Sequence, residues 1–388
     1  MNLPPVYAIT DRKVSGIDDI PEIAQRLLRV GMRWIQVREK ELPDRALLAA
    51  VDEVAARVRA EGGTALVNDR VDLARAAGVG VHLGEEDLPA AAARALLLPG
   101  SVLGISTHDR AAALRAFGQG AVDYVAFGPV FPSATKDVRP ARGLEELARV
   151  AAARTKPLVA IGGITVDRLE RVWETGADSA AMIGGLLADG RLEQNARGAL
   201  DRARRRSFGR IYLVGFMGSG KTAVGRRIAE RLELPFIDLD VEIERVSGLT
   251  VRAFFEKEGE AAFRERESAF LQATESLPRA VVATGGGAFP REENRRVIGR
   301  LGASVFLDLP FERIAVRLAG KTDRPLFRSL AEAHQLFLVR EPHYRLASVR
   351  VPFEGTEEID EAADRVLIAL DRHRERTPPP GGEVRAPS

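Results

Sequence analysis

The clearest chemical signal in the sequence is the stretch 215–222, Gly-Phe-Met-Gly-Ser-Gly-Lys-Thr, which fills every fixed position of the phosphate-binding pattern G-x-x-x-x-G-K-[ST]. Its glycines let successive backbone N–H groups turn toward a phosphate chain at a helix N-terminus, whose dipole favours anions. Lys221 is placed to reach the β- and γ-phosphates of a nucleotide, and the Thr222 hydroxyl to bind Mg²⁺. A glycine-rich turn that binds nothing is the alternative, but the apolar run 211–214 and the helical pattern 223–232 supply the strand and helix that the pattern requires. The sequence therefore predicts a nucleotide site.

A second set of polar side chains lies in the first half of the chain, where short apolar runs end. Gln36, Arg38 and Lys40 alternate at the end of one run, so a strand would point all three to the same side. Two cations and an amide suit a polyphosphate, whereas a solvated strand end would need no ligand. Asp69 and Asp87 follow the next two runs and could converge on Mg²⁺, although either could instead cap the helix that follows it.

Later runs in this half end in hydroxyl groups, an ammonium group and glycines. The loop at 128–136 offers two hydroxyls and a lysine, and glycines follow the last two runs, where barrels commonly bind a phosphate on backbone amides. The candidates at these ends are Ser106, Ser133, Thr135, Lys136 and the stretches 161–165 and 182–185.

These polar ends belong to a regular alternation of short apolar runs with helical patterns. Eight such units in about 200 residues predict a small TIM barrel, whose chemistry lies at the C-terminal ends of its strands. The expected strands are 6–10, 34–38, 65–68, 80–83, 102–106, 124–128, 158–161 and 179–183. The expected helices are 20–30, 44–60, 71–77, 88–97, 111–118, 144–153 and 166–175.

The second half predicts an open parallel sheet around the phosphate loop, with the ligand at the carboxyl edge of the strands. Residues 235–240, Pro-Phe-Ile-Asp-Leu-Asp, form a short strand that ends in two acids, one for the Mg²⁺ shell and one for an acceptor hydroxyl. Three glycines at 285–287 follow a strand and allow a small ligand to approach the backbone. The loop 320–326 combines a glycine hinge with two cations.

Composition limits the class of protein. The chain has 388 residues, which favours two domains, and no cysteine, which excludes disulfides and thiolate metal sites. Its 57 Lys and Arg nearly balance 55 Asp and Glu, so charge gives no argument for nucleic acid, and no run approaches the roughly 18 apolar residues of a membrane span. The basic run 202–210 is interpreted as a solvated helix end and linker. We expect a cytoplasmic protein with small-molecule substrates and no nucleic-acid or membrane partner; self-association is left open.

Residues about 5–200 resemble thiamine-phosphate synthase, because the elements Q-x-R-E-K, N-D, G-x-x-D, G-x-S, G-P-x-F-P-x-x-T-K and I-G-G-I occur in the order of that family. The resemblance implies condensation of hydroxymethylpyrimidine diphosphate with a thiazole phosphate, with loss of pyrophosphate. It assigns the pyrimidine diphosphate to Gln36, Arg38, Lys40, Asn68, Ser106 and Lys136, and its Mg²⁺ to Asp69 and Asp87. It assigns the thiazole phosphate to Ser133, Thr135, Gly163, Met182 and Ile183.

The first half departs from that family at one visible position. Ser133 stands where the family often has Thr, which keeps the hydroxyl. A sister branch, the thiazole tautomerases, shares the barrel and the Arg-Glu-Lys sequence. Asp87 and the intact loop 132–136 argue against that branch.

Residues about 209–372 resemble shikimate kinase. The matching elements are G-x-x-G-x-G-K-T, F-I-D-x-D, G-E-x-x-F-R-x-x-E, G-G-G-A, R-P-L and R-x-x-x-Y-R. Gluconate kinases are the nearest relatives with which this family could be confused. The resemblance assigns ATP to Gly218, Ser219, Gly220, Lys221, Thr222, Ala223, Arg317 against the adenine, and Arg324 from a lid. It assigns Mg²⁺ to Thr222 and Asp238, and shikimate to Asp240, Arg264, Gly286, Gly287 and Arg345. The catalytic candidates are Asp240, Lys221 and Arg324.

In the second half, one position departs from the pattern of the family and another has an alternative explanation. Ala223 stands where the family usually has a second hydroxyl, which removes one hydrogen bond to the nucleotide, worth about 1 kcal/mol. Arg264 could instead form an ion pair on a solvated helix, with Glu267 or Glu260.

The sequence thus predicts an α/β chain with an N-terminal (βα)8 barrel at 1–207, a phosphate-loop kinase domain with an open parallel sheet at 208–373, and a disordered tail at 374–388. It predicts a bifunctional enzyme that uses Mg²⁺ at both sites and ATP as co-substrate. One alternative keeps the kinase and makes the barrel tautomerase-like or non-catalytic. Another, a nucleotide-dependent binding switch, would need no acceptor-holding groups such as Asp240 and Arg345.

Overall fold

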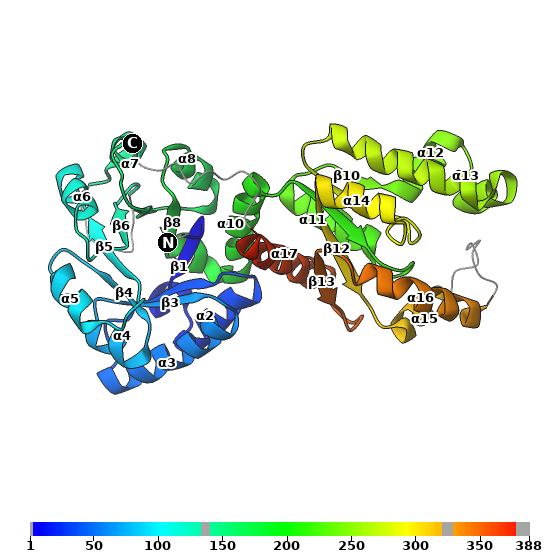
Figure 1. Cartoon of the computed structure of the whole chain (residues 1–388). Coiled ribbons are helices and arrows are strands. Elements are labelled where there is room, and N and C mark those ends of the chain that lie inside the picture. The colour runs from blue at the N-terminus through cyan, green and yellow to red at the C-terminus, as the bar shows by residue number, and fades with distance from the viewer. Residues whose placement is uncertain (1–2, 133–139, 320–328, 378–388) are drawn as a thin grey trace. The chain divides into compact units, whose positions relative to one another are not determined.

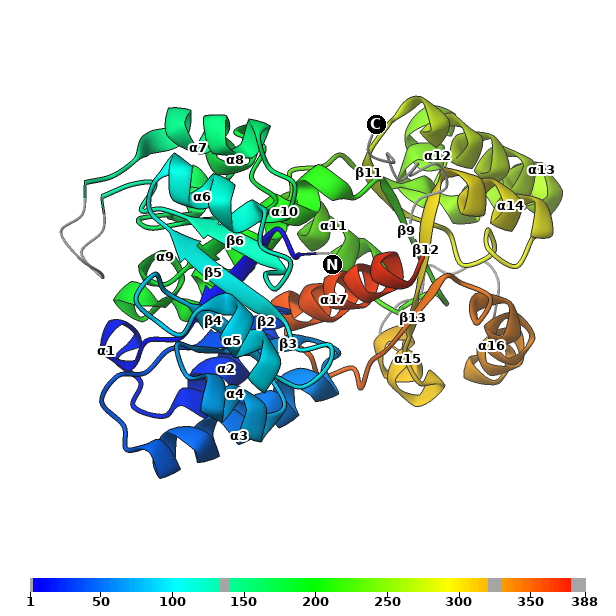
Figure 2. The ribbon, with the colours of Figure 1, turned by 60° about the vertical axis from the view of Figure 1, so that its left-hand side comes forward.

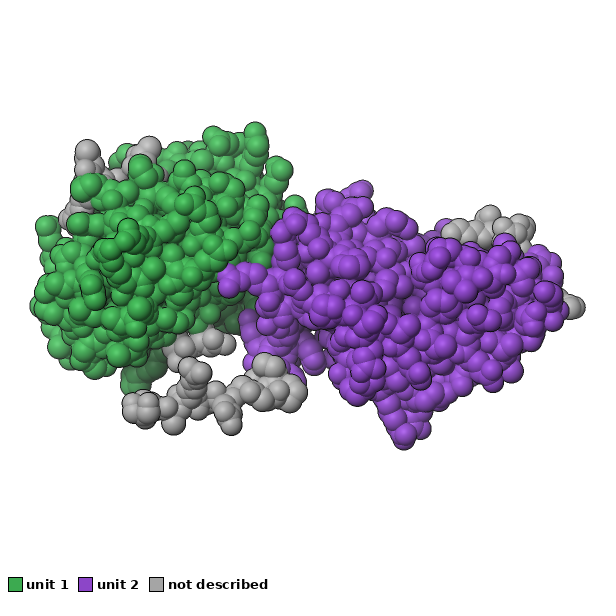
Figure 3. All heavy atoms as spheres, turned by 90° about the horizontal axis from the view of Figure 1, so that it is seen from above, with its two compact units in different colours: residues 1–203 green, residues 204–388 purple. Residues whose placement is uncertain are grey.

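The computed structural model describes residues 3–132, 140–319 and 329–377 (Figure 1). The chain divides into two compact units, Met1–Ala203 and Arg204–Ser388 (Figure 3). This division falls within helix α10 (Leu192–Ser207), a few residues before the boundary at 207 expected from the sequence.

The first unit is a closed barrel of parallel strands that pair in chain order, with helices around the outside (Figures 1 and 2). Its strands are β1 (Val6–Ile9), β2 (Trp34–Val37), β3 (Thr64–Asn68), β4 (Gly80–Leu83), β5 (Leu103–Thr107), β6 (Tyr124–Phe127), β7 (Leu158–Ile161) and β8 (Ser179–Met182). Its helices are α1 (Arg12–Ser15), α2 (Ile20–Arg29), α3 (Asp44–Ala60), α4 (Val71–Ala77), α5 (Ala90–Leu96), α6 (Arg110–Phe117), α7 (Gly143–Ala152), η1 (Val166–Arg168), α8 (Leu169–Glu174), α9 (Gly184–Leu187), η2 (Ala188–Gly190) and α10.

The strands are largely apolar because both of their faces are covered. Their outward side chains pack against the helices, while the barrel interior holds a separate cluster that includes Tyr7, Leu66 and Tyr124. Gly104 on β5 makes room for this cluster, because a Cβ at that position would lie 2.0 Å from Cζ of Tyr124. The fully buried Tyr124 ring therefore requires glycine on the neighbouring strand.

The second unit has one parallel sheet with the strand order β10-β11-β9-β12-β13. The strands are β9 (Arg210–Val214), β10 (Phe236–Asp238), β11 (Ala280–Ala283), β12 (Gly302–Asp308) and β13 (Val349–Pro352). The helices are α11 (Lys221–Leu232), α12 (Leu239–Ser247), α13 (Val251–Ala273), η3 (Thr274–Ser276), α14 (Glu292–Leu301), α15 (Phe311–Leu318), α16 (Leu330–Tyr344) and α17 (Ile359–Arg376). The central strand β9 leads directly into the glycine-rich loop, which is the topology expected for a phosphate-loop domain.

Three local predictions for this unit are wrong. Asp240 does not end a strand but lies in the first turn of α12, because the Asp238 carboxylate caps that helix and accepts the Asp240 N–H at 3.2 Å. Arg204, expected on a solvated linker, is 3% exposed and binds Asp371 at 2.8 and 2.9 Å. Residues 374–376, expected in the tail, belong to α17.

No helix in the described ranges has the length and apolar content to cross a membrane.

The packing of Tyr124 gives a stability prediction. Gly104→Ala should destabilise the barrel by roughly 1–3 kcal/mol, the usual range for overpacking a core, because Cβ would overlap the buried ring. Tryptophan fluorescence during urea unfolding reports this unit, since Trp34 and Trp173 both lie in it.

Gly120→Ala is the matched control, because a Cβ at Gly120 meets no atom within 4 Å. Equal unfolding midpoints for the two variants would contradict the packing argument.

Candidate active sites

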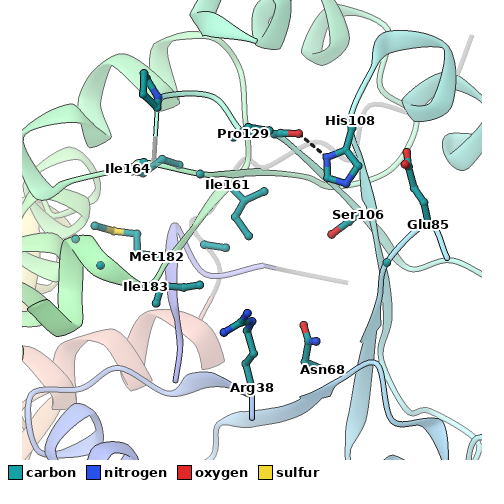
Figure 4. Close-up of a pocket in the computed structure, with 18 of the residues that line it drawn as sticks. Arg38, Asn68, Glu85, Ser106, His108, Pro129, Ile161, Ile164, Met182 and Ile183 are labelled. Atoms are coloured by element: carbon teal, nitrogen blue, oxygen red, sulfur yellow. Dashed lines mark hydrogen bonds between the residues drawn. The ribbon is translucent and has the colours of Figure 1, made fainter. Parts of the chain in front are cut away.

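A cavity of about 670 Å³ lies at the carboxyl ends of the barrel strands (Figure 4). Figure 4 shows Ser106, His108 and Glu85 on one side of it, and Ile164 and Met182 on the opposite side. The sequence-predicted residues that line this cavity are Arg38, Lys40, Asn68, Asp69, Asp87, Ser106, Gly163, Met182 and Ile183. Ser133, Thr135 and Lys136 lie outside the described residues.

Gln36 is not part of the lining of this cavity and contacts it through Asn68. Its side chain is 1% exposed, and Nε2 donates a hydrogen bond to Oδ1 of Asn68 at 2.8 Å. This bond orients the Asn68 amide, which does line the cavity. The structure therefore gives Gln36 a contact with Asn68 in place of the cavity position predicted from the strand alternation.

Arg38 is held at the cavity by a half-buried partner. Its Nη1 donates to Oδ2 of Asp11 at 2.6 Å, and Asp11 also accepts the Val14 N–H, which caps α1. Glu39 does not line the cavity; it pairs with Arg12 at 2.5 Å. Burial raises the pKa of Glu39, but hydrogen bonds from Arg12 and from backbone N–H groups outweigh it and bring the pKa to about 2.

Asp69 and Asp87 both line the cavity, and neither occupies the N-cap position of the following helix. The N-cap residues are Arg70 for α4 and Pro89 for α5. Asp69 has φ 65°, a left-handed conformation that is uncommon for residues other than glycine and clusters at functional sites. Asp87 accepts the Gly84 N–H at 2.6 Å. The helix-capping alternative is therefore wrong for both carboxylates.

These carboxylates suit Mg²⁺ by their chemistry, since it prefers oxygen ligands and commonly combines one or two carboxylates with substrate phosphates. Within the described residues, no group of three His, Asp or Glu side chains could hold a metal by itself. A metal at Asp69 and Asp87 would therefore need further oxygen ligands, from water or from a phosphorylated substrate.

Ser106 is held by a buried hydrogen-bond chain that the sequence did not reveal. His82, which is 3% exposed, forms hydrogen bonds of 2.8 Å with Ser106 Oγ and with the Tyr124 hydroxyl. His82 also stacks on the Tyr124 ring. A lone histidine in an apolar strand was the one available signal. The missed residues that line the cavity include Glu85, His108 and Arg168.

Glycines form the wall of the cavity that follows β7 and β8. A Cβ at Gly163 would lie 2.4 Å from the Pro132 carbonyl oxygen, and a Cβ at Gly185 would lie 2.2 Å from that of Ile164. Gly163 also has φ 60°. Only glycine fits at Gly163 and Gly185, so this wall presents backbone groups to a ligand.

The phosphate loop of the second unit has the expected local geometry. Gly215, Gly218 and Gly220 have φ of 143°, 80° and 100°, values open to glycine. Lys221 Nζ donates to the carbonyl oxygens of Gly215 and Phe216, each at 2.9 Å, so its ammonium lies within the loop.

Two of the residues predicted for the nucleotide site form hydrogen bonds at this loop. Thr222 Oγ1 donates to Oδ2 of Asp238 at 2.7 Å, which brings together the hydroxyl and carboxylate predicted for Mg²⁺, both oxygen donors that suit this ion. Arg317 Nη1 donates to the Gly218 carbonyl at 3.2 Å, so its guanidinium lies at the loop. Arg324 lies outside the described residues.

A cluster of charged side chains meets the glycines at 285–287. A Cβ at Gly285 would lie 2.1 Å from Glu267 Oε1 and 2.7 Å from Asp240 Oδ1. A Cβ at Gly287 would lie 2.2 Å from Cζ of Arg264. The absence of side chains at these glycines is what allows the acids and the guanidinium to converge.

Arg264 does form the ion pairs considered as an alternative, but it is not on a solvated face. It binds Glu267 at 2.9 Å and Glu260 at 3.0 Å, and its side chain is 11% exposed. Glu267 is fully buried, and its Oε1 has no hydrogen-bond partner among the described residues. Burial, with a smaller contribution from Asp240, raises the pKa of Glu267 to about 7 against the opposing effect of Arg264.

The structure does not bring Arg345 to this cluster. Arg345 is 51% exposed and pairs with Glu341 one turn earlier on α16. Arg340 lies there instead: it is 8% exposed, and its Nη1 would lie 3.6 Å from a Cβ at Gly286. That Cβ position at Gly286 would also lie 3.5 Å from the backbone nitrogen of Met217 in the phosphate loop. The second arginine of the cluster is therefore Arg340.

The fold and these sites define a fused pair of phosphate-handling enzymes, a TIM barrel with a charged mouth and a phosphate-loop kinase domain. Residues 6–186 match the family model of thiamine monophosphate synthase, and residues 217–371 match that of shikimate kinase. The chain belongs to both families, the thiamine-phosphate synthases through its first half and the shikimate kinases through its second.

Individual relatives cover one half of the chain each. A putative thiamine-phosphate synthase of Geobacter sulfurreducens is 40% identical over 198 residues, 50% of this chain and 92% of the relative. A shikimate kinase of Ruegeria pomeroyi is 38% identical over 183 residues, 46% of this chain and 94% of the relative. A solved thiamine phosphate pyrophosphorylase from Pyrococcus furiosus is 30% identical, covering 51% of this chain and 95% of its own, with a TM-score of 0.47. The relatives do not favour a tautomerase-like or non-catalytic barrel.

The raised pKa of Glu267 gives a pH prediction for stability. Between its ordinary value of 4.5 and about 7, the folded chain keeps a proton on Glu267 that the unfolded chain releases, so this group lowers stability as pH rises through that interval. Glu267→Gln removes the titration. The free energy of unfolding of the wild type, minus that of the variant, should therefore decrease from about pH 5 to about pH 8.

Urea unfolding followed by circular dichroism measures this difference, with tryptophan fluorescence as the separate signal of the barrel. A difference that stays constant or grows with pH would mean that Glu267 is ionised throughout.

Proposed function

We propose that this chain catalyses two reactions at separate sites. The barrel condenses hydroxymethylpyrimidine diphosphate with thiazole phosphate and releases pyrophosphate, and the second unit transfers the γ-phosphoryl group of ATP to the 3-hydroxyl of shikimate. The observation that carries the proposal is that each unit gathers cations and carboxylates where its parallel strands end. Membership of both families supports it.

In the kinase unit, the proposed roles follow from position. Lys221 and the loop amides hold the nucleotide phosphates, and Arg317 lies at the loop for contact with the adenine. Arg264 and Arg340 bind the carboxylate of shikimate, for which planar guanidinium groups are suited. Asp240, beside Gly285, orients the acceptor hydroxyl. Catalysis of phosphoryl transfer depends mainly on positioning the reactants in this way and on neutralising the phosphate charge.

In the barrel, Arg38 and Lys40 bind the diphosphate that leaves, and Asn68 and Ser106 hold the pyrimidine substrate. The contacts of Arg38 with Asp11 and of Ser106 with His82 fix these groups before the substrate arrives. Such preorganised charges act on the developing negative charge of the leaving group. Backbone groups after β7 and β8, including those of Gly163 and Ile183, receive the thiazole phosphate.

We propose Mg²⁺ at both sites, on Asp69 and Asp87 in the barrel and on Thr222 and Asp238 in the kinase unit. The ion would neutralise phosphate charge in each case. The 2.7 Å contact between Thr222 and Asp238 supports the second assignment.

Two assays on the purified full chain test the pair of reactions: ATP-dependent phosphorylation of shikimate, and formation of thiamine phosphate from its two precursors. Lys221→Met should abolish only the first activity, because its ammonium lies in the phosphate loop. Asp69→Ala should abolish only the second, since it removes a cavity carboxylate. A single substitution that silences both activities would contradict two independent sites.

Arg340 and Arg345 form a matched pair for the shikimate contact. Arg340→Met should raise the KM for shikimate by roughly 10- to 100-fold, the loss expected for a hydrogen-bonded charge, without changing the KM for ATP. Arg345→Met should leave both constants within about twofold, as is usual for an exposed pair. Initial-rate kinetics of both variants decide the assignment, and the opposite ranking would restore Arg345.

A further inference from the structure

The wall of the barrel cavity formed by the ends of β7 and β8 carries an arginine that the predicted site did not include. Arg168, the last residue of η1, lines the cavity next to Gly162, Gly163, Gly184 and Gly185. The four lining carboxylates, Asp69, Glu85, Glu86 and Asp87, all follow β3 or β4. Among the described lining residues that follow β7 and β8, Arg168 is the one charged side chain.

The guanidinium of Arg168 is held in a fixed place. Its Nη1 donates to the Gly163 carbonyl at 2.8 Å, and its Cζ lies 4.7 Å from the centroid of the Phe131 ring. The Phe131 N–H in turn donates to the Gly162 carbonyl at 3.0 Å, which ties the segment after β6 to that after β7. One face of the guanidinium is therefore covered and one of its N–H groups is used.

Within the described residues, the remaining N–H groups of Arg168 have no acceptor, which leaves them for a ligand. Within the described residues it forms no ion pair with a carboxylate, unlike Arg38, which is bound to Asp11. A half-buried guanidinium without a carboxylate partner, in a cavity wall of glycines, is matched to an anion. The same wall presents backbone groups at Gly163 and Gly185, where no Cβ fits.

We infer that Arg168 binds the phosphate of the second substrate through its free N–H groups and so helps this barrel to select a phosphorylated thiazole. The inference rests on the proposed synthase reaction and adds to it a side-chain cation, where the predicted site relied on backbone groups. Arg38 and Lys40, which follow β2, serve the diphosphate; Arg168, which follows β7, serves the monophosphate. The carboxylates after β3 and β4 place the metal with the diphosphate.

The test compares two acceptors, thiazole phosphate and the corresponding unphosphorylated thiazole alcohol, on the purified full chain. Arg168→Gln should lower kcat/KM for thiazole phosphate by roughly 10- to 100-fold, because one charged hydrogen-bonding group is lost. It should leave kcat/KM for the alcohol and the KM for the pyrimidine diphosphate unchanged. Arg168→Lys, which keeps the charge without the planar fork, should fall between the wild type and the Gln variant.

Arg171→Gln is the matched control, since Arg171 is exposed on α8 three residues later. The shikimate kinase rate of the same molecules checks that each variant is folded. Equal losses with both acceptors would mean that Arg168 only supports the loop, and a raised KM for the pyrimidine diphosphate would assign it to the other substrate. Either result would overturn the inference.

Calorimetric titration with thiazole phosphate separates this inference from the proposed function. If the wild type binds thiazole phosphate and Arg168→Gln does not, the inference holds even when no thiamine phosphate is formed, and the synthase proposal alone fails. If the wild type forms thiamine phosphate but both proteins bind thiazole phosphate equally, the synthase proposal holds and the inference fails. If the wild type neither binds nor converts it, both are wrong.

Discussion

Both units depend on one electrostatic requirement: the negative charge of phosphate groups must be met by N–H groups and cations that are already in place. Parallel strands meet this requirement because all their carboxyl ends lie at the same edge, where the following loops can converge. In the barrel the converging groups are side chains such as Arg38 and Lys40. In the second unit the loop after β9 supplies backbone amides together with Lys221.

Cations at such an edge need support, because a long side chain loses conformational freedom when it is held in one place. The chain provides this support through a few partly buried contacts. Asp11 fixes Arg38, Glu267 fixes Arg264, and the Gly163 carbonyl fixes Arg168. Glu267 shows the cost of the arrangement: full burial beside Asp240 raises its pKa to about 7, so the ion pair that positions Arg264 is itself close to protonation at neutral pH.

The sequence predicted the fold well because hydrophobic periodicity and glycine-rich loops are local signals. Helices such as Asp44–Ala60 and Val71–Ala77 have the expected bounds. It failed where tertiary contacts decide. The pattern of residues 235–240 predicted a strand that includes Asp240, but Asp238 caps a helix that begins at Leu239. On α16, Arg345 and Arg340 look equivalent in sequence, yet Arg340 shares a helix face with the buried Tyr344 at i,i+4 while Arg345 shares one with Glu341. Arg168 and His82 belong to no motif, and only the closed barrel brings Arg168 to the cavity and His82 to Ser106.

The central claim is that two independent places on this chain bind phosphate groups. Calorimetric titration of the full chain with magnesium pyrophosphate, in the presence of saturating MgADP, measures it most directly, because the nucleotide occupies the phosphate loop. The account predicts one pyrophosphate per chain under these conditions, lost in Lys40→Met and retained in Lys221→Met. Absence of pyrophosphate binding once ADP is bound, or binding that survives Lys40→Met unchanged, would contradict it.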